Sequence, residues 1–159
     1  MLMLNADNVG QQYLAEAFGP DNPLNGDEPV ILSVGRDGSI MGACAYQNYR
    51  GTSIEMSVAG FGPWLSPGNI AGFLSYPFNQ LGVNRITVFT RRTNTRCIKL
   101  VEGLGFQHEG TLRGSTPDGA DLLMFGLLRD EAARWLKLSL RTKWMKNDGQ
   151  EIPKCAPAP

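Results

Sequence analysis

The chain has 159 residues, of which 42% are hydrophobic, and this length and composition suit one folded domain rather than two. Fifteen basic residues balance fifteen acidic ones, so no global electric field draws the protein to phosphate backbones or anionic lipid. Nucleic acid is therefore not expected as a partner.

The first predicted elements are a helix and a hairpin. Asp7 can cap a short amphipathic helix that ends at Gly19. The runs Val30–Val34 and Ser39–Tyr46 are then typical of two strands, and the turn between them reverses at Asp37-Gly38. Glycine takes the positive φ of such a turn at little cost. The pattern therefore predicts an antiparallel pair.

A third strand is predicted over Thr52–Val58, where apolar and polar residues alternate. This alternation places Glu55 on the face opposite Ile54 and Met56. Ser66-Pro67 then reads as a helix cap followed by proline at the first helical position. Pro77 should kink or end this helix, because its ring excludes a backbone hydrogen bond.

The second half of the chain predicts another strand and helix. Arg85–Thr90 is rich in β-branched and aromatic residues, which favours a strand. Asn94 or Thr95 can cap the next helix, and Gly105 supplies its end.

The remaining segments predict a hairpin and a final helix. Phe106–Arg113 and Asp121–Leu128 read as antiparallel strands, and a helical pattern runs from Arg129 to about Met145. We expect one domain over residues 1–146 and a disordered tail over residues 147–159. The order of elements describes an α+β domain around a mixed, mostly antiparallel central sheet flanked by helices. Parallel strands are expected where a helix crosses over.

Further expectations concern membranes and metals. The longest apolar run, Leu122–Leu128, is far shorter than the ~20 residues of a membrane-spanning helix. The amino end has no basic segment of the signal-peptide kind, so a cytoplasmic protein is expected. Three widely spaced cysteines and a single histidine suit reduced thiols and no metal site.

One segment resembles a known family. Residues 94–113 read NTRCIKLVEGLGFQHEGTLR. This run is similar to the pattern N-x-x-S-x-x-(apolar)-x-E-x-x-G-F-x-x-E-G-x-x-R of GNAT acetyltransferases. The similarity is greatest to the branch that acetylates the amino termini of ribosomal proteins, and a compact phage-type member is one candidate. The resemblance implies a GNAT-like sheet, acetyl-CoA as cosubstrate and transfer to a primary amine.

The resemblance also implies where acetyl-CoA binds. Its pyrophosphate is expected on backbone N–H groups at a helix start, here Gly68, Asn69 and Ile70, although the basic residue that usually enters this loop is missing. The backbone N–H of Val58 or a neighbour is expected to polarise the acetyl carbonyl.

Two residues of the motif are further candidates for contacts with coenzyme A. The amide of Asn94 could bind the amide-rich arm, and it could equally serve only as a helix cap. Arg96, together with Arg91 and Arg92, could supply positive charge, and each of these arginines could equally be a solvated surface residue.

Two residues are candidates for proton transfer. Glu55, on the strand expected to flank the acetyl group, could take the proton of the acceptor ammonium, or be an ordinary strand carboxylate. Cys97 stands where related enzymes often carry serine and could protonate the departing thiolate, or simply pack in the helix.

The sequence thus favours an N-acetyltransferase that uses acetyl-CoA and a primary amine by direct attack. The acceptor is a protein amino terminus, a lysine or a small amine, and a homodimer stays open. The alternative is a non-catalytic acyl-CoA-binding or protein-interaction module whose phosphate loop has changed.

Overall fold

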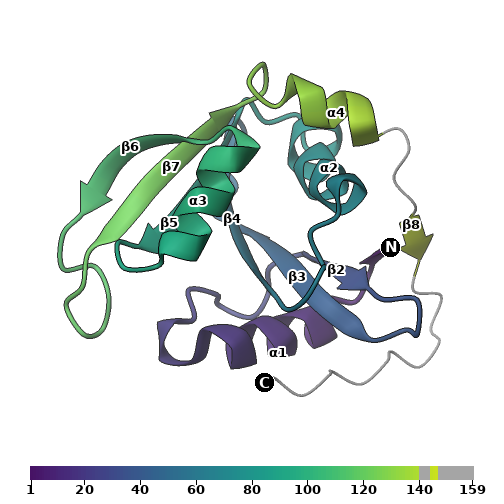
Figure 1. Cartoon of the computed structure of the whole chain (residues 1–159), viewed down its shortest axis with the longest axis horizontal. Coiled ribbons are helices and arrows are strands. Elements are labelled where there is room, and N and C mark those ends of the chain that lie inside the picture. Colours follow the sequence, from purple (N-terminus) through teal and green to yellow (C-terminus); the bar gives the residue numbers. More distant parts are fainter. Residues whose placement is uncertain (140–143, 147–159) are drawn as a thin grey trace.

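A computed structural model describes residues 1–139 and 144–146 of the chain. The elements follow in the order β1 (Leu2–Leu4), α1 (Asp7–Phe18), η1 (Gly19–Asp21), β2 (Val30–Val34), β3 (Ile40–Gln47), β4 (Ser53–Gly60), α2 (Pro67–Ser75), η2 (Tyr76–Gln80), β5 (Arg85–Arg91), α3 (Thr95–Leu104), β6 (Gln107–Leu112), β7 (Leu122–Leu128), α4 (Ala133–Ser139) and β8 (Trp144–Lys146). Figure 1 shows this mixture of helices and strands, which confirms the predicted α+β class.

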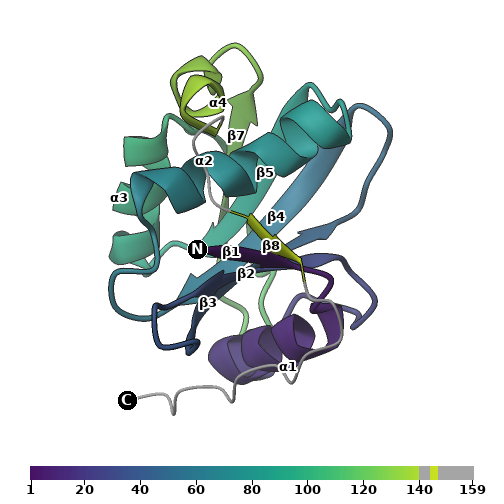
Figure 2. The same ribbon diagram turned by 90° about the vertical axis from the view of Figure 1, so that its right-hand side faces the viewer.

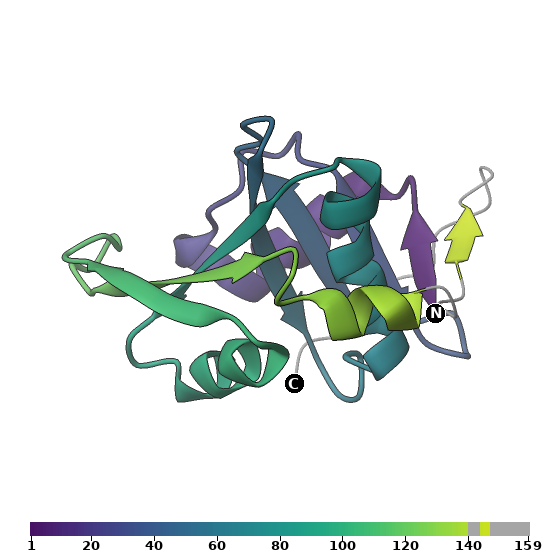
Figure 3. The same cartoon turned by 90° about the horizontal axis from the view of Figure 1, so that it is seen from above.

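The strands form one sheet in the order β6-β7-β5-β4-β3-β2-β1-β8. Neighbouring strands are antiparallel except for the pairs β4–β5 and β1–β8. The parallel pair β4–β5 arises because α2 carries the chain back across the sheet, as a parallel connection requires. Figure 3 shows the β6–β7 hairpin extending away from the rest of the sheet.

Helices cover both faces of the sheet (Figure 2). On one face, α1 packs Tyr13 and Leu14 against a cluster from β2 and β3 that also touches Ala59 of β4. On the other face, α2, α3 and α4 pack over a larger cluster that includes Ile54 and Met56 of β4. Because side chains alternate along a strand, the odd-numbered residues of β4 face the α1 side and the even-numbered ones face α2 and α3.

Local signals fix several helix ends as predicted. The Ser66 hydroxyl accepts a hydrogen bond from the Asn69 N–H at 3.2 Å and caps α2. The Asn94 side-chain oxygen accepts from the Cys97 N–H at 3.0 Å and caps α3. Gly105 ends α3 with φ of 106°, a left-handed conformation that favours glycine. Each of these signals lies within a few residues of the end that it sets.

Pro77 acts as expected, and Asp7 does not. The α-helical part of α2 ends at Ser75, and the chain continues as a π-helical turn that contains Pro77. Ala6, not Asp7, occupies the cap position of α1. The Asp7 carboxylate instead accepts the Val30 N–H at 2.8 Å, because that donor from β2 lies beside the start of α1.

The predicted final helix is too long. α4 ends at Ser139, and Trp144–Lys146 forms β8, which pairs in parallel with β1. The predicted tail over residues 147–159 lies outside the described residues. No helix in the described part of the chain has the length and apolar character needed to cross a membrane.

Candidate functional site

The parallel strands β4 and β5 are hydrogen-bonded over a short stretch only. Ser53–Glu55 pairs with Arg85–Thr87, and the ladder ends there although β4 runs on to Gly60 and β5 to Arg91. Beyond Glu55 and Thr87 the two strands separate. We call this place, where β4 and β5 part, the strand fork.

The β4 edge of the strand fork presents backbone groups. The Phe61 N–H donates to the Met41 carbonyl at 2.9 Å, so these residues form a hydrogen-bonded pair of the β3–β4 arrangement. In an antiparallel ladder such pairs alternate with pairs whose N–H and C=O groups point outward. Met56, Val58 and Gly60 therefore direct their backbone groups toward β5. Because Val58 lies past the last β4–β5 pair, its N–H faces the strand fork.

Glu55 stands at the start of the strand fork on the α1 face of the sheet. Its Oε2 atom accepts hydrogen bonds from the Asn48 side-chain amide at 3.0 Å and from the Gln47 side-chain amide at 3.5 Å. Within residues 1–139 and 144–146, its Oε1 atom has no hydrogen-bond donor. One oxygen is thus held in place while the other can take a proton from a ligand.

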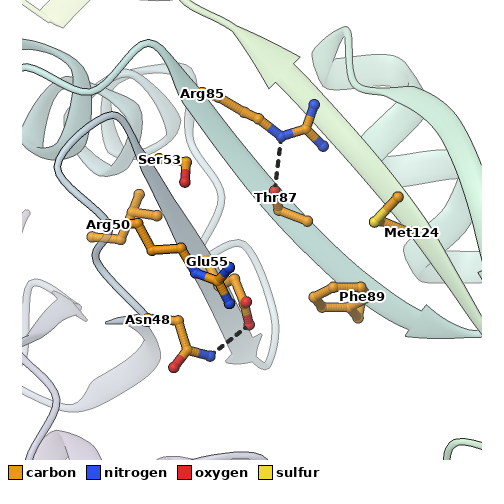
Figure 4. A pocket seen from close by; sticks show the side chains of 9 residues that line it. Asn48, Arg50, Ser53, Glu55, Arg85, Thr87, Phe89 and Met124 are labelled. Atoms are coloured by element: carbon orange, nitrogen blue, oxygen red, sulfur yellow. Dashed lines mark hydrogen bonds between the residues drawn. The ribbon is translucent and has the colours of Figure 1, made fainter.

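A pocket of about 240 Å³ opens beside Glu55. Its lining consists of Asn48, Arg50, Ser53, Ile54, Glu55, Arg85, Thr87, Phe89 and Met124. Figure 4 shows Asn48, Arg50 and Glu55 on the β4 side of the pocket, with Phe89 and Met124 on the opposite side. The pocket therefore has a polar wall that carries Glu55, and Phe89 of β5 and Met124 of β7 give it an apolar part on the opposite side.

Arg85 is held at the pocket by a neighbouring strand. Its guanidinium forms a two-pronged ion pair with Glu109 of β6, in which the Nη1–Oε1 distance is 2.8 Å, and its Nε donates to the Thr87 hydroxyl at 3.1 Å. The Arg85 guanidinium lowers the pKa of the Glu109 carboxyl group. The ion pair lies over Gly126 of β7, where a Cβ atom would overlap the Glu109 carboxylate. Glu109 of the sequence motif therefore links β6 to β5 rather than lining the pocket.

The α3 candidates lie on the other face of the sheet. Cys97 is half-buried, packs against the core beneath α2 and α3, and contacts Thr90 on the β5 side of the strand fork. Burial raises the pKa of the Cys97 thiol, although the hydrogen bond with Thr90 opposes this effect. The thiol is therefore protonated at neutral pH. Asn94, the cap residue of α3, and Arg96, in its first turn, are both exposed.

The start of α2 is occupied by its own cap. Pro67 has no N–H, and the Asn69 and Ile70 N–H groups donate to the hydroxyl and carbonyl of Ser66. The Asn69 side chain is buried and donates to Ser33 and to the Trp64 carbonyl, both at 2.8 Å. Phosphate binding by the Asn69 N–H would thus require the Ser66 hydroxyl to turn away.

Trp64 anchors the loop that leads into α2. Its ring is buried and lies over Gly42 of β3 and Gly60 of β4, where a Cβ atom on either glycine would overlap the indole. Its carbonyl also accepts a hydrogen bond from the Ser33 hydroxyl at 3.2 Å. Two adjacent glycines thus make room for a tryptophan that fixes the helix start against the sheet.

Two of the candidate basic residues are engaged by carboxylates. The Arg91 guanidinium binds Asp21 of η1 at 2.7 Å and Asp118 of the β6–β7 turn at 2.9 Å. These pairs lower the pKa values of both aspartates. Arg92 contacts Asp121 at 3.4 Å. Arg96 has no ion pair within the described part of the chain, so it is the least occupied of the three arginines.

The structure divides the predicted residues between two faces. Glu55 lies on the α1 face beside the pocket, whereas Val58 and Cys97 flank the strand fork from the side of α2 and α3. Sequence reasoning missed the pocket residues Arg50, Thr87 and Phe89. Alternation along β5 could have placed Thr87 and Phe89 on one face, but the β4–β5 register that brings them beside Glu55 has no local signal.

The sequence matches no protein-family profile and no curated protein. Solved structures do match. A ribosomal-protein-alanine N-acetyltransferase from Brucella melitensis gives a TM-score of 0.63 at 17% identity, over 80% of this chain and 99% of that one. An acetyltransferase of the GNAT family from Bacillus anthracis gives 0.61 at 13% identity, over 81% and 94%. Mutant forms of a spermidine/spermine N-acetyltransferase from Vibrio cholerae give 0.59 at 19% identity, over 77% and 79%. The chain therefore has the GNAT fold that its motif predicted.

Proposed function

We propose, with the GNAT fold as the premise, that this chain is an N-acetyltransferase that moves an acetyl group from acetyl-CoA to a primary amine. The observation that carries the proposal is the position of Glu55. Its half-engaged carboxylate stands where the strand fork begins and where the pocket opens. A base at this point can take a proton from an amine in the pocket, and that amine is then close to a thioester bound in the strand fork.

The residues around the strand fork suit a ligand with an amide-rich arm. The outward N–H and C=O groups of Val58 and Gly60 can pair with an extended chain of amides, as a sheet edge does. Asn94 can add its side-chain amide, and Arg96 can add charge. At the start of α2, Gly68, Asn69 and Ile70 suit phosphate only if the Ser66 cap opens.

The proposed reaction is direct attack of the amine on the thioester that bound acetyl-CoA supplies. The free Oε1 atom of Glu55 takes the ammonium proton, directly or through water, so that the nitrogen lone pair becomes available. The Val58 N–H donates a hydrogen bond to the carbonyl oxygen as negative charge develops there. As the C–S bond breaks, the protonated Cys97 thiol can donate its proton to the departing sulfur. The nitrogen then loses a second proton to solvent, and solvent restores the proton of Cys97.

The fold does not indicate the acceptor, because similar solved structures are named for different acceptors. One is named for the alanine of a ribosomal protein and another for spermidine and spermine. A protein amino terminus, a lysine and a small amine therefore all belong in a first panel.

A non-catalytic acyl-CoA-binding module is the second candidate, and one observation favours it. Pro67 and the Ser66 cap leave the start of α2 with fewer available donors than an open helix start offers. Such a chain would bind acetyl-CoA weakly and would not turn it over.

Calorimetry with acetyl-CoA, followed by a thiol-release assay over amines and peptides, separates these functions. We expect binding and amine-dependent thiol release. Binding without release on any acceptor would favour the module, and absence of binding would overturn both.

Replacement of Asn94 tests whether its amide binds the cosubstrate. Asn94→Ser keeps an oxygen that can cap α3 but removes the amide, so acetyl-CoA affinity should fall by about 1 kcal/mol, or roughly fivefold, at unchanged thermal stability. Asn94→Ala should lose both affinity and stability. If Asn94→Ser binds acetyl-CoA as well as the unmodified chain does, Asn94 serves only as the cap.

Replacement of Cys97 tests its proton-donor role. Cys97→Ala should lower kcat by about tenfold. The loss should be modest, because a thiolate of ordinary pKa leaves with little help from an acid. Cys97→Ser keeps a donor and should retain most of the rate. Equal rates for both variants at saturating acetyl-CoA would reduce Cys97 to a packing residue.

A further inference from the structure

Charged side chains of both signs line the pocket beside Glu55, and they determine which acceptor amine the pocket can bind. Glu55 supplies a carboxylate, and Arg50 and Arg85 supply guanidinium groups. Arg85 is paired with Glu109, which does not line the pocket, so its charge is already balanced. Arg50 forms no ion pair within residues 1–139 and 144–146. Glu55 and Arg50 are therefore the charged groups of the pocket that form no ion pair in the described part of the chain.

Arg50 and Glu55 come from neighbouring positions at the start of β4. The Arg50 N–H donates to the Ser53 carbonyl at 2.9 Å, so Arg50 stands beside the start of β4. Ser53 and Glu55 share one face of the strand and are separated by about 7 Å along it. Figure 4 shows both charged side chains on the same side of the pocket. A small molecule can reach both.

The remaining lining residues suit a short molecule with an apolar part. Phe89 and Met124 offer an apolar wall, and the pocket volume of about 240 Å³ is small for a ligand site. Arg50 is exposed, so its guanidinium is solvated and available to an anionic group of a ligand in the pocket. A polycation would place one of its charges near this guanidinium, and like charges repel.

We propose that the acceptor is a small amine that also carries an anionic group, of the amino-acid type. Its ammonium group binds Glu55 and its anionic group binds Arg50. This inference rests on the proposed acetyltransferase function and deepens it. The same chemistry could come from a free amino acid or from a peptide with an acidic side chain next to its amino terminus.

The test compares acids with their carboxamides, because these differ only in the anionic group. In the thiol-release assay with acetyl-CoA, we expect kcat/KM for amino acids such as glutamate and β-alanine to exceed that of the matched carboxamides at least about tenfold. Peptides that begin with Ala-Glu or Ala-Gln, assayed alongside, show whether the source is a protein.

Arg50→Gln should lower kcat/KM for the acids about tenfold, mainly through KM, and leave the carboxamides unchanged. Arg36→Gln is the matched control, because Arg36 is exposed in the β2–β3 turn and does not line the pocket. Preference for carboxamides or for spermidine, or an acid preference that survives in Arg50→Gln, would overturn the inference and leave the acetyltransferase function standing. Absence of acetyl-CoA binding would overturn both.

Discussion

Glu55→Gln should lower kcat about 10²- to 10³-fold at neutral pH while acetyl-CoA affinity changes little. Glutamine has nearly the same shape and keeps an oxygen that can accept from the Asn48 amide, so the side chain should stay in place. What it loses is the ability to take a proton from the ammonium group. Steady-state thiol release measures the rate, and calorimetry measures acetyl-CoA affinity.

The control for this experiment is Glu102→Gln, because Glu102 is exposed on α3 and does not line the pocket. It should leave kcat unchanged. A second check uses pH: an amine with a pKa near 8 deprotonates in solution by about pH 9, so the deficit of Glu55→Gln should shrink there. A deficit that stays constant with pH, or no deficit at all, would assign the base to another group.

Trp64→Ala should lower the free energy of unfolding by about 3–5 kcal/mol, the usual cost of removing a buried aromatic side chain. The indole fills the space over Gly42 and Gly60, and its ring lies 6.0 Å from that of Phe73 in α2. Its loss opens a cavity between the sheet and the start of α2. We therefore also expect weaker acetyl-CoA binding. Urea denaturation measures the first effect, and calorimetry on the folded variant measures the second.

Glycine substitutions provide a matched pair for the same contact. Gly60→Ala should destabilise the protein by about 1–3 kcal/mol, because the added methyl group overlaps the Trp64 ring. Gly103→Ala, at a helical position with open space around it, should instead stabilise by about 0.5–1 kcal/mol. If Gly60→Ala is as harmless as Gly103→Ala, Trp64 does not hold the loop as described.

The features that the sequence predicted are those set by near neighbours. Ser66, Asn94 and Gly105 each act within one helical turn, so their roles can be read from the residues beside them. Alternation likewise placed Glu55 opposite Ile54. The wrong predictions came from partners that are distant in the sequence. Asp7 binds the Val30 N–H, which no pattern around Asp7 could indicate.

The carboxyl-terminal strand and the pocket follow the same rule. Trp144–Lys146 continues an amphipathic pattern, yet it pairs with Leu2–Leu4 at the other end of the chain. The pocket needs the β4–β5 register, and no pattern within either strand indicates that register. The sequence therefore offered no reason to single out Arg50, in the turn before β4. The fold shows that it lines the same pocket as Glu55 and Phe89.

The bridge from Arg85 to Glu109 has a consequence for evolution. The two side chains meet above Gly126 because that position has no side chain. Any larger residue at 126 would push the carboxylate aside and leave Arg85 without its partner at the edge of the pocket. Positions 85, 109 and 126 should therefore vary together among descendants of this chain. A lineage that loses the glycine should lose the ion pair in the same step and gain an unpaired cation at the edge of the pocket.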